Sequence, residues 1–310
     1  MVVYQLPGYQ NHENPYNALL CDSLQEAGAQ IVEYSHAGLL KGPKPSILHI
    51  HWPEYWLSRK PWKAAKRHYQ LTMLSLLLSR IRGAKVVWTA HNLRPHDSLY
   101  PEAEKKFYQM WAKKIDGYTC LSQSALKLLG ETHPQFGPVP HAVIPHGHYR
   151  SRITGVNQEE ARRSLRVDPN ATVLGSFGAI RPYKNIPHLV RQFRESAKGN
   201  EILLIAGKCS EDSLQREIQA AKGDDERVRL DFRFLPDDLI ELYVSASDLL
   251  AFPYTGILTS GSALYALSVG RPLIAPAQGS LPELRDDVGQ EWMHLYQGQF
   301  TGEVLRGAMD

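Results

Sequence analysis

Residues 253–276, PYTGILTSGSALYALSVGRPLIAP, contain the turn, helix and strand that decide the fold. The polar turn TSGS at 259–262 precedes an apolar run, Gly270 ends that run, and 273–276 predicts a short buried strand. Hydroxyl side chains before a helix can cap its free N–H groups. The same N–H groups, with a glycine among them, also attract a phosphate. The choice between a cap and a phosphate cradle depends on the rest of the chain.

Short β-rich runs followed by helical patterns recur along the whole sequence. Strands are predicted at 2–6, 47–51, 85–89, 117–121, 142–145, 172–177, 201–206, 228–234 and 248–252, and helices at 14–28, 61–81, 101–115, 122–130, 185–197, 211–222 and 237–245. This alternation is typical of βαβ units and a parallel sheet. The rhythm stops at 146–170, so we predict two α/β domains, 1–150 and 151–310.

Composition is that of an ordinary globular protein. The chain has 310 residues, which suits two domains, with 43% hydrophobic and 22% charged residues. Three cysteines lie far apart without a CxxC pattern, which favours a reducing compartment and argues against disulfides or a zinc site. The N-terminus lacks a basic, apolar leader, and no apolar run reaches about 18 residues, so neither a signal peptide nor a membrane span is predicted.

Basic residues are concentrated in the first half of the chain. Residues 1–150 hold 17 Lys and Arg against 10 Asp and Glu, whereas 151–310 hold 18 against 22. The segment 59–85 places eight basic residues around the apolar run LTMLSLLL. This segment fits either a core helix with charged ends or a basic, amphipathic surface on anionic lipid. The second interpretation suits an acceptor carried on a membrane lipid.

A second pattern typical of anion binding lies upstream of the 259–262 turn. Residues 175–186, GSFGAIRPYKNI, follow a predicted strand and precede a predicted helix. The glycines let the backbone approach a ligand, and Arg181 and Lys184 place two cations at the helix start, as a diphosphate requires. A solvated basic turn is the structural alternative. Two such loops at strand ends of one domain predict a bound nucleoside diphosphate, although the chain has neither a P-loop sequence nor GxGxxG after its first strand.

Several segments together resemble a known family. GAIRPYKNIPHLVRQF, LLIAGK, LYVSASDLLAFPY and TSGSALYALSVGRPLIAPAQGSLPEL resemble the C-terminal domain of GT-B glycosyltransferases, and TAHNLRPHD, YTCLSQSA and VIPHGHY are similar to their N-terminal domain. Within that superfamily the resemblance is closest to family-4-like bacterial enzymes and to the β-mannosyltransferases of exopolysaccharide assembly. It implies two Rossmann-like α/β/α domains facing across a cleft, with an acceptor site in 1–150 and a nucleotide-sugar site in 151–310.

The resemblance also implies roles for individual residues. Arg181 and Lys184 would stabilise the leaving diphosphate, the turn at 259–262 would bind phosphate, and two residues of RFLPDD with Tyr254 would line the base pocket. The donor-binding residues predicted in this way are Gly178, Arg181, Lys184, Lys208, Phe234, Leu235, Tyr254, Thr259, Ser260, Gly261 and Ser262.

The sequence departs from the family pattern at two positions. Retaining family-4 enzymes have two glutamates eight residues apart, and here Ile257 and Tyr265 occupy those places. An inverting reaction, in which a base deprotonates the acceptor hydroxyl, is therefore an alternative to retention. The predicted catalytic residues follow predicted strands of the first domain: Glu54 or Asp97 as the base, and His91 as a hydrogen-bond donor or sugar contact. Their structural alternatives are a solvated loop charge for Glu54, a helix cap for Asp97 and a residue that holds a tight turn for His91.

Metal and cofactor signals are missing from the sequence. There is no HExxH and no Asp-x-Asp, the pattern with which sugar transferases of the other major fold hold a cation on the diphosphate. Here Arg, Lys and helix N-termini would do that, so we expect no metal and no cofactor. Trp52 and Trp56 fit either the core or a stacking platform for a sugar ring.

The function expected from these patterns is hexose transfer from a nucleoside-diphosphate sugar, GDP-mannose or a UDP-sugar, to a glycan or lipid-linked glycan in exopolysaccharide biosynthesis. A sugar-nucleotide epimerase of the same fold and a non-catalytic relative that binds nucleotide or glycan are the alternatives. A nucleic-acid partner is not expected, because the basic half has no recognised reading motif. We expect a cytoplasmic protein, located at the inner face of the membrane. Related enzymes carry a further C-terminal helix that crosses back over the N-terminal domain, and we expect EVLRGAMD to begin that helix and then stop.

Overall fold

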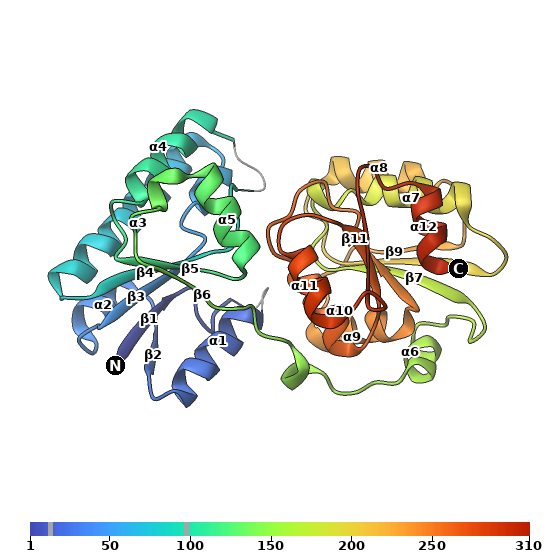
Figure 1. The fold of residues 1–310 in the computed structure, drawn as a ribbon, viewed down its shortest axis with the longest axis horizontal. Coiled ribbons are helices and arrows are strands. Elements are labelled where there is room, and N and C mark those ends of the chain that lie inside the picture. Colours follow the sequence, from blue (N-terminus) through green and yellow to red (C-terminus); the bar gives the residue numbers. More distant parts are fainter. Residues whose placement is uncertain (12–14, 96–98) are drawn as a thin grey trace. The chain divides into compact units, whose positions relative to one another are not determined.

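The computed structural model describes residues 1–11, 15–95 and 99–310. These residues form two units, Met1–Gly147 and His148–Asp310, each with its own sheet and helices (Figure 1). The sequence predicts the boundary near residue 150. Within the described ranges, no helix is both long enough and apolar enough to cross a membrane.

The first unit is built on one parallel sheet of six strands in the order β2-β1-β3-β4-β5-β6. Its elements are β1 (Val2–Leu6), α1 (Pro15–Glu26), β2 (Gln30–Glu33), α2 (His36–Lys41), β3 (Ile47–His51), α3 (Trp62–Ile81), β4 (Lys85–Ala90), α4 (Pro101–Trp111), β5 (Gly117–Cys120), α5 (Gln123–Thr132) and β6 (His141–Val143). The strand order reverses between β1 and β3. In open α/β sheets, ligands bind at the carboxyl ends of the strands where this reversal occurs.

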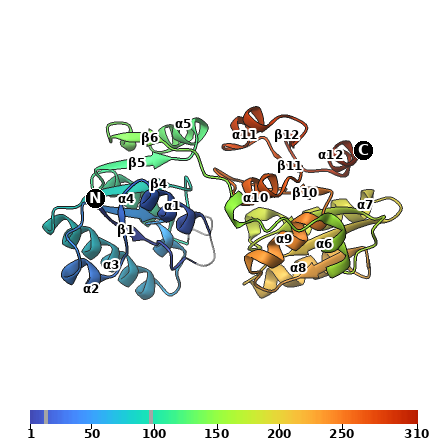
Figure 2. The ribbon, with the colours of Figure 1, turned by 90° about the horizontal axis from the view of Figure 1, so that it is seen from below.

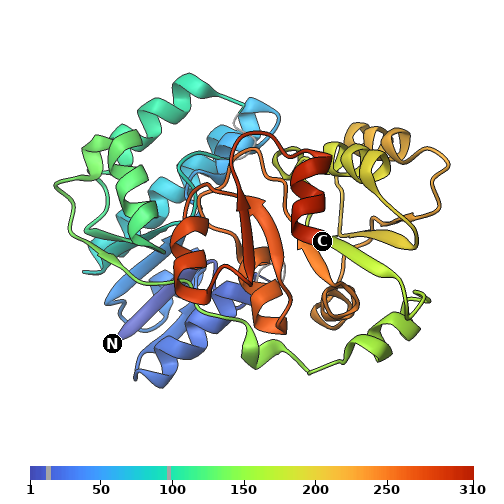
Figure 3. The ribbon, with the colours of Figure 1, turned by 45° about the vertical axis from the view of Figure 1, so that its right-hand side comes forward.

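The second unit repeats this design with the order β12-β11-β10-β7-β8-β9. Its elements are α6 (Gln158–Ser164), β7 (Thr172–Phe177), α7 (Ile186–Ser196), β8 (Glu201–Ala206), α8 (Asp212–Lys222), β9 (Val228–Asp231), α9 (Asp237–Ala246), β10 (Leu249–Ala251), α10 (Gly261–Val269), β11 (Leu273–Pro276), α11 (Leu281–Val288), β12 (Met293–Tyr296) and α12 (Gly302–Met309). The orange and red strands β10, β11 and β12 run side by side in Figure 3. The reversal of strand order falls between β7 and β10, and the two predicted anion-binding loops follow these two strands.

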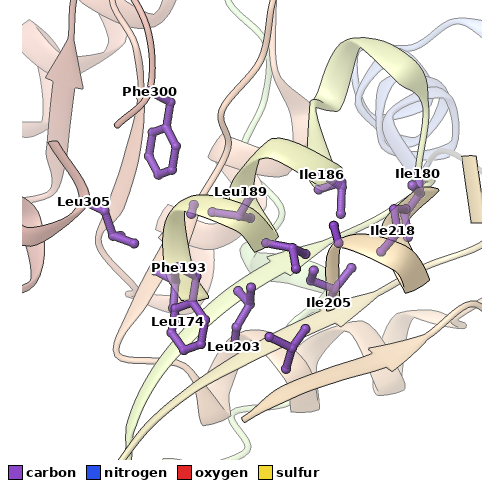
Figure 4. Close-up of a cluster of buried hydrophobic side chains, with 14 of the residues drawn as sticks. Leu174, Ile180, Ile186, Leu189, Phe193, Leu203, Ile205, Ile218, Phe300 and Leu305 are labelled. Atoms are coloured by element: carbon purple, nitrogen blue, oxygen red, sulfur yellow. The ribbon is translucent and has the colours of Figure 1, made fainter. Parts of the chain in front are cut away.

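The core of the second unit explains its regular pattern. Ile186, Leu189 and Phe193 project from one face of α7 at helical spacing and pack with Leu203 and Ile205 of β8 (Figure 4). Successive turns of an amphipathic helix place residues three or four positions apart on one side. Burial of this face, at roughly 25 cal/mol per Å² of apolar surface, fixes the helix on the sheet.

The predicted strands and helices are confirmed, with shifts at some of their ends. The prediction omits β2, β12, α2, α6 and α11. These elements have between four and eight residues, too few to show a clear hydrophobic period.

Helix α3 has an inverted distribution of side chains. The residues that it buries are mostly small or hydroxylated: Ala65, Thr72, Ser75, Leu76 and Ser79. The hydroxyls of Thr72, Ser75 and Ser79 donate to backbone carbonyls one turn earlier, so they are satisfied without water. Figure 2 shows α2 beside α3 in the first unit. The interpretation of 59–85 as a core helix with charged ends therefore fits only the buried face of α3.

Large apolar side chains lie on that outward face instead. Leu71, Leu74, Leu77 and Ile81 are 41, 41, 57 and 72% exposed and follow one another at intervals of three or four residues. Lys63, Lys66 and Arg67 continue the same face toward the start of the helix and are also exposed. A helix that packs on a soluble core normally has the opposite arrangement, with its large apolar side chains turned inward.

The segment that enters the second sheet is held by a buried carboxylate. Glu241 of α9 accepts hydrogen bonds from the backbone N–H groups of Thr154, Gly155 and Val156 at 2.7–3.0 Å, and from the Thr154 hydroxyl at 2.9 Å. Burial alone would raise the pKa of Glu241, but the hydrogen bonds from this segment outweigh burial and lower it.

Replacement of Glu241 by Gln should therefore destabilise the second unit. The amide presents two N–H donors to a nest of donors, so we expect the free energy of unfolding to fall by about 2 kcal/mol at pH 7. Because the pKa is lowered on folding, the contribution of Glu241 is present above its ordinary value of 4.5 and is lost as the pH falls through the folded pKa. Urea unfolding at pH 7 and pH 3 measures both effects.

The control for this substitution is Glu159→Gln, which changes an exposed carboxylate paired with Arg163. That variant should lose less than about 0.5 kcal/mol. Equal stability of the Glu241 and Glu159 variants at pH 7 would contradict the role of Glu241.

Candidate functional site

The loop after β7 brings three of the predicted donor-binding residues together. Lys184 ends a short 3₁₀ turn, is only 6% exposed, and donates from Nζ to the carbonyl of Phe177 at 3.1 Å. A Cβ atom added at Gly178 would lie 3.2 Å from Nζ of Lys184 and 3.4 Å from Oγ of Ser262. The ammonium of Lys184, the hydroxyl of Ser262 and the backbone of Gly178 therefore lie close together.

The Lys184 ammonium is held in an unusual state. Burial, and then the nearby Arg181 cation, lowers the pKa of Lys184 to about 8. A buried cation beside another cation is unfavourable until an anion arrives. This electrostatic arrangement favours an anionic ligand such as a phosphate.

The loops after β7 and β8 lie in direct backbone contact. The N–H of Gly178 donates to the carbonyl of Ala206 at 3.0 Å, and the N–H of Ile180 donates to the carbonyl of Lys208 at 2.8 Å. Gly207 has φ +148°, and a Cβ atom there would lie 2.1 Å from the carbonyl oxygen of Gly178. Glycine is thus required at Gly207, which lies in LLIAGK but is not among the predicted donor-binding residues.

The turn before α10 contains a helix cap and also a hydroxyl group that can form a further hydrogen bond. Ser260 is the N-cap: its Oγ accepts from the N–H of Ala263 at 3.1 Å and lies 3.2 Å from the hydroxyl of Tyr254. Oγ1 of Thr259 is buried and has no hydrogen-bond partner among the residues that the structure describes. Ser262 faces Gly178, as stated above. Capping and phosphate binding are therefore compatible in this turn.

The predicted base-pocket residues have different surroundings. Tyr254 is buried, stacks on Phe252 and contacts the ring of Tyr183, so it belongs to the same cluster as Ser260. Phe234 is 51% exposed and Leu235 is buried. Their contact with a nucleotide base stays a prediction.

A second cluster lies at the carboxyl edge of the first sheet. His49 and His51 of β3 and His91 after β4 are buried beside Gln5 of β1. Nε2 of His49 lies 2.7 Å from Oγ1 of Thr89, and the rings of His49 and His51 are 4.3 Å apart. His91 is among the predicted catalytic residues. The sequence gives no signal for Gln5, and the spacing of His49 and His51 fits strand alternation as well as metal ligation.

Trp52 completes this cluster with a strained backbone. Its indole stacks on the ring of His91, with centroids 4.3 Å apart and planes 22° from parallel. It has φ +49°, a conformation that costs a non-glycine residue on the order of 1–3 kcal/mol. Such strain is found where the surrounding structure holds a residue in place for a function.

Glu54 lies close to this cluster in sequence but is deeply buried. Burial raises the pKa of the Glu54 carboxyl to about 7, and Oε2 has no hydrogen-bond partner within the described parts of the chain. A carboxyl with this pKa can act as a base near neutral pH. Asp97 falls outside the described residues. In the part of the chain that the structure describes, no group of three or more His, Cys, Asp or Glu side chains could hold a metal ion.

Comparison with known proteins identifies the class. Residues 171–296 match the family described as Glycosyl transferases group 1. A GDP-mannose:glycolipid 4-beta-D-mannosyltransferase of Xanthomonas campestris pv. campestris is 29% identical over 298 residues, which cover 96% of this chain and 79% of the relative.

Solved structures agree on the fold. Sucrose-phosphate synthase from Thermosynechococcus elongatus gives a TM-score of 0.73 at 15% identity, covering 99% of this chain and 88% of that one. Anabaena HepE, solved with UDP-glucose, gives 0.64 at 16% identity, covering 99% and 87%. The protein has the GT-B fold, and the relatives that it resembles over most of its length are named as glycosyltransferases. More particularly, its second unit is a group 1 glycosyl transferase domain.

Proposed function

We propose that the protein transfers a hexose from a nucleoside-diphosphate sugar to a glycan acceptor carried on a lipid. The observation that carries this proposal is the convergence of Lys184, Gly178 and Ser262 at the β7–β10 reversal of the second sheet. A diphosphate leaving group gains negative charge as the glycosidic bond breaks, and a preorganised cation with hydroxyl and N–H donors stabilises that charge. The donor-binding residues predicted from sequence take these roles in the proposal.

The sugar and base of the donor are proposed from the relatives. The Xanthomonas enzyme is named for GDP-mannose, so GDP-mannose is the first donor to test. HepE was solved with UDP-glucose, which makes a UDP-sugar the second. Calorimetric titration of GDP-mannose, UDP-glucose and their free diphosphates tests the proposal. Tight binding of one donor supports it, and absence of binding to every donor contradicts it.

Metal independence and the lack of a cofactor are also proposals. Arg181, Lys184 and the N-terminus of α10 supply the positive charge that a divalent cation supplies elsewhere. Transfer assayed with and without EDTA should proceed at the same rate. A rate that is lost with EDTA and restored by Mg²⁺ or Mn²⁺ would overturn this part of the proposal.

A sugar-nucleotide epimerase of the same fold is the alternative function, and it differs from the transferase in needing no acceptor. An epimerase converts the donor without any acceptor, whereas the transferase releases nucleoside diphosphate only when it transfers sugar to an acceptor or to water. Product analysis with and without a glycolipid acceptor separates the two. Conversion of the sugar without diphosphate release would favour the epimerase.

The acceptor is proposed to reach the protein at an anionic membrane surface. The outward face of α3 presents Leu71, Leu74, Leu77 and Ile81, and residues 59–85 contain eight Lys and Arg and no Asp or Glu. Apolar side chains that enter the headgroup region and cations that attract anionic lipid are the two terms of interfacial binding. The relative that acts on a glycolipid is consistent with this partner.

Removal of two cations from α3 should weaken membrane binding. Each basic residue near an anionic surface contributes about 1 kcal/mol, so Lys63→Ala with Lys66→Ala should lower vesicle affinity about 30-fold. Sedimentation with phosphatidylglycerol-containing vesicles, at low and high salt, measures the change. Lys113→Ala is the control, since Lys113 is exposed in the same unit but lies outside α3. Equal binding to anionic and purely zwitterionic vesicles would contradict the proposal.

A further inference from the structure

Three side chains on adjacent strands of the first sheet form a continuous hydrogen-bonded chain. Oε1 of Gln5 in β1 lies 3.2 Å from Nε2 of His51 in β3, and Nδ1 of His51 lies 3.0 Å from Nε2 of His91 after β4. All three side chains are buried. The chain crosses the β1–β3 reversal of strand order, the position at which an open α/β sheet binds a ligand.

The pKa values of His51 and His91 are both lowered, which favours the neutral form of each ring. Burial, then the neighbouring His49 and His91, lowers the pKa of His51 well below 6.5. Burial, then His146 and His49, does the same for the pKa of His91. A neutral imidazole carries one N–H and one lone pair, so each ring is either of two tautomers.

The carboxamide of Gln5 decides which tautomer each ring adopts. A carboxamide oxygen only accepts hydrogen bonds, so Nε2 of His51 carries its hydrogen and Nδ1 of His51 accepts. Nε2 of His91 must then donate to that nitrogen. Nδ1 of His91 is left with the lone pair. If the carboxamide presented its NH₂ group instead, every donor in the chain would reverse and Nδ1 of His91 would carry hydrogen.

We propose that Gln5 and His51 are positioning residues that hold His91 as its Nε2–H tautomer, so that Nδ1 of His91 accepts a hydrogen bond from a substrate hydroxyl. This inference rests on the proposed function, because the hydroxyl belongs to a sugar. Trp52 fixes the plane of the same ring by stacking on it. His91 thereby acts as a hydrogen-bond acceptor in this site and not as a donor.

The tautomer is measured on the free protein without any substrate. Two-bond ¹H–¹⁵N spectra distinguish protonated from unprotonated ring nitrogens, and a His91→Gln variant assigns the signals of His91. We expect the protonated nitrogen to be Nε2. A protonated Nδ1 in the unaltered protein would overturn the inference.

Substitutions test whether the chain sets this state. His51→Leu removes the nitrogen that accepts from His91, and Gln5→Met removes the oxygen that orients His51. In both variants His91 should lose its single tautomer and show a mixture. His51→Asn places an amide oxygen near the position of Nδ1 and should restore the Nε2–H form. Thermal melting confirms that each variant is folded. An unchanged His91 tautomer in folded His51→Leu would overturn the positioning role.

Kinetic measurements test whether the Gln5–His51–His91 hydrogen bonds affect the reaction. They also separate this inference from the proposed function. With a glycolipid acceptor, His51→Leu should lower kcat at least about 10-fold and His51→Asn should recover most of it, with the KM for the donor unchanged. Unchanged kcat in His51→Leu, despite an altered tautomer, would refute the role toward a sugar hydroxyl. Failure of the unaltered protein to transfer any sugar would instead refute the proposed function and leave the spectroscopic result standing.

Discussion

Substitution of Lys184 by Met should lower kcat for glycosyl transfer about 10²–10³-fold, the usual cost of removing one preorganised group that stabilises a developing charge. The Lys184 ammonium lies beside Gly178 and Ser262 and is buried with only 6% exposure. Methionine retains the length of the side chain and removes its charge. The free energy of unfolding should not fall, because a buried cation near Arg181 opposes folding until an anion binds. Steady-state kinetics and thermal melting together separate these effects.

The same lysine predicts a dependence of donor affinity on pH. Its pKa is lowered to about 8 in the free protein, and only the ammonium form attracts a diphosphate. The affinity should therefore be greatest below pH 8 and should weaken as the pH rises through that value. Lys184→Met should remove this dependence. Lys198→Met, at an exposed position paired with Asp310, should leave both the affinity and its pH profile unchanged, and a Lys184→Met variant with normal donor affinity would contradict the diphosphate site.

The sequence predicts the second unit better than the first, for a physical reason. Strands such as β7 and β8 are continuous apolar runs buried on both faces, and α7 has a clear helical period, so local patterns report the packing directly. The prediction of two anion-binding loops rests on residue types and their places after predicted strands. Burial of Lys184 could not be predicted, because it depends on the approach of Gly178 and Ser262 from separate parts of the chain.

The first unit shows where local patterns mislead. The leucines of α3 look like a core stripe, yet the helix buries Ser75 and Ser79 and exposes Leu74 and Leu77. Composition alone cannot say which face of a helix meets the sheet. The contact of Gln5 with His51 depends on strand order, because β1 lies between β2, the edge strand, and β3.

Replacement of Gly207 by Ala should strongly destabilise the second unit. Its added Cβ would lie 2.1 Å from the carbonyl oxygen and 2.6 Å from the carbonyl carbon of Gly178. Both neighbours are backbone atoms that the hydrogen bond from Gly178 to Ala206 holds in place. Relief requires the two loops to separate, which moves Gly178 away from Lys184. We expect the free energy of unfolding to fall by more than about 3 kcal/mol and donor binding to be lost.

Gly199→Ala is the matched control for this loss. Gly199 also has a positive φ, +52°, but an added Cβ there would meet no atom within 4 Å. It should cost about 1 kcal/mol through backbone strain alone and leave donor affinity intact. Urea unfolding measures the stability of both variants, and calorimetry measures donor binding under conditions where each is folded. If the two substitutions cost the same, the contact between the β7 and β8 loops does not determine the geometry of the site. If Gly207→Ala is unstable but binds donor normally when folded, the contact stabilises the unit without positioning Lys184.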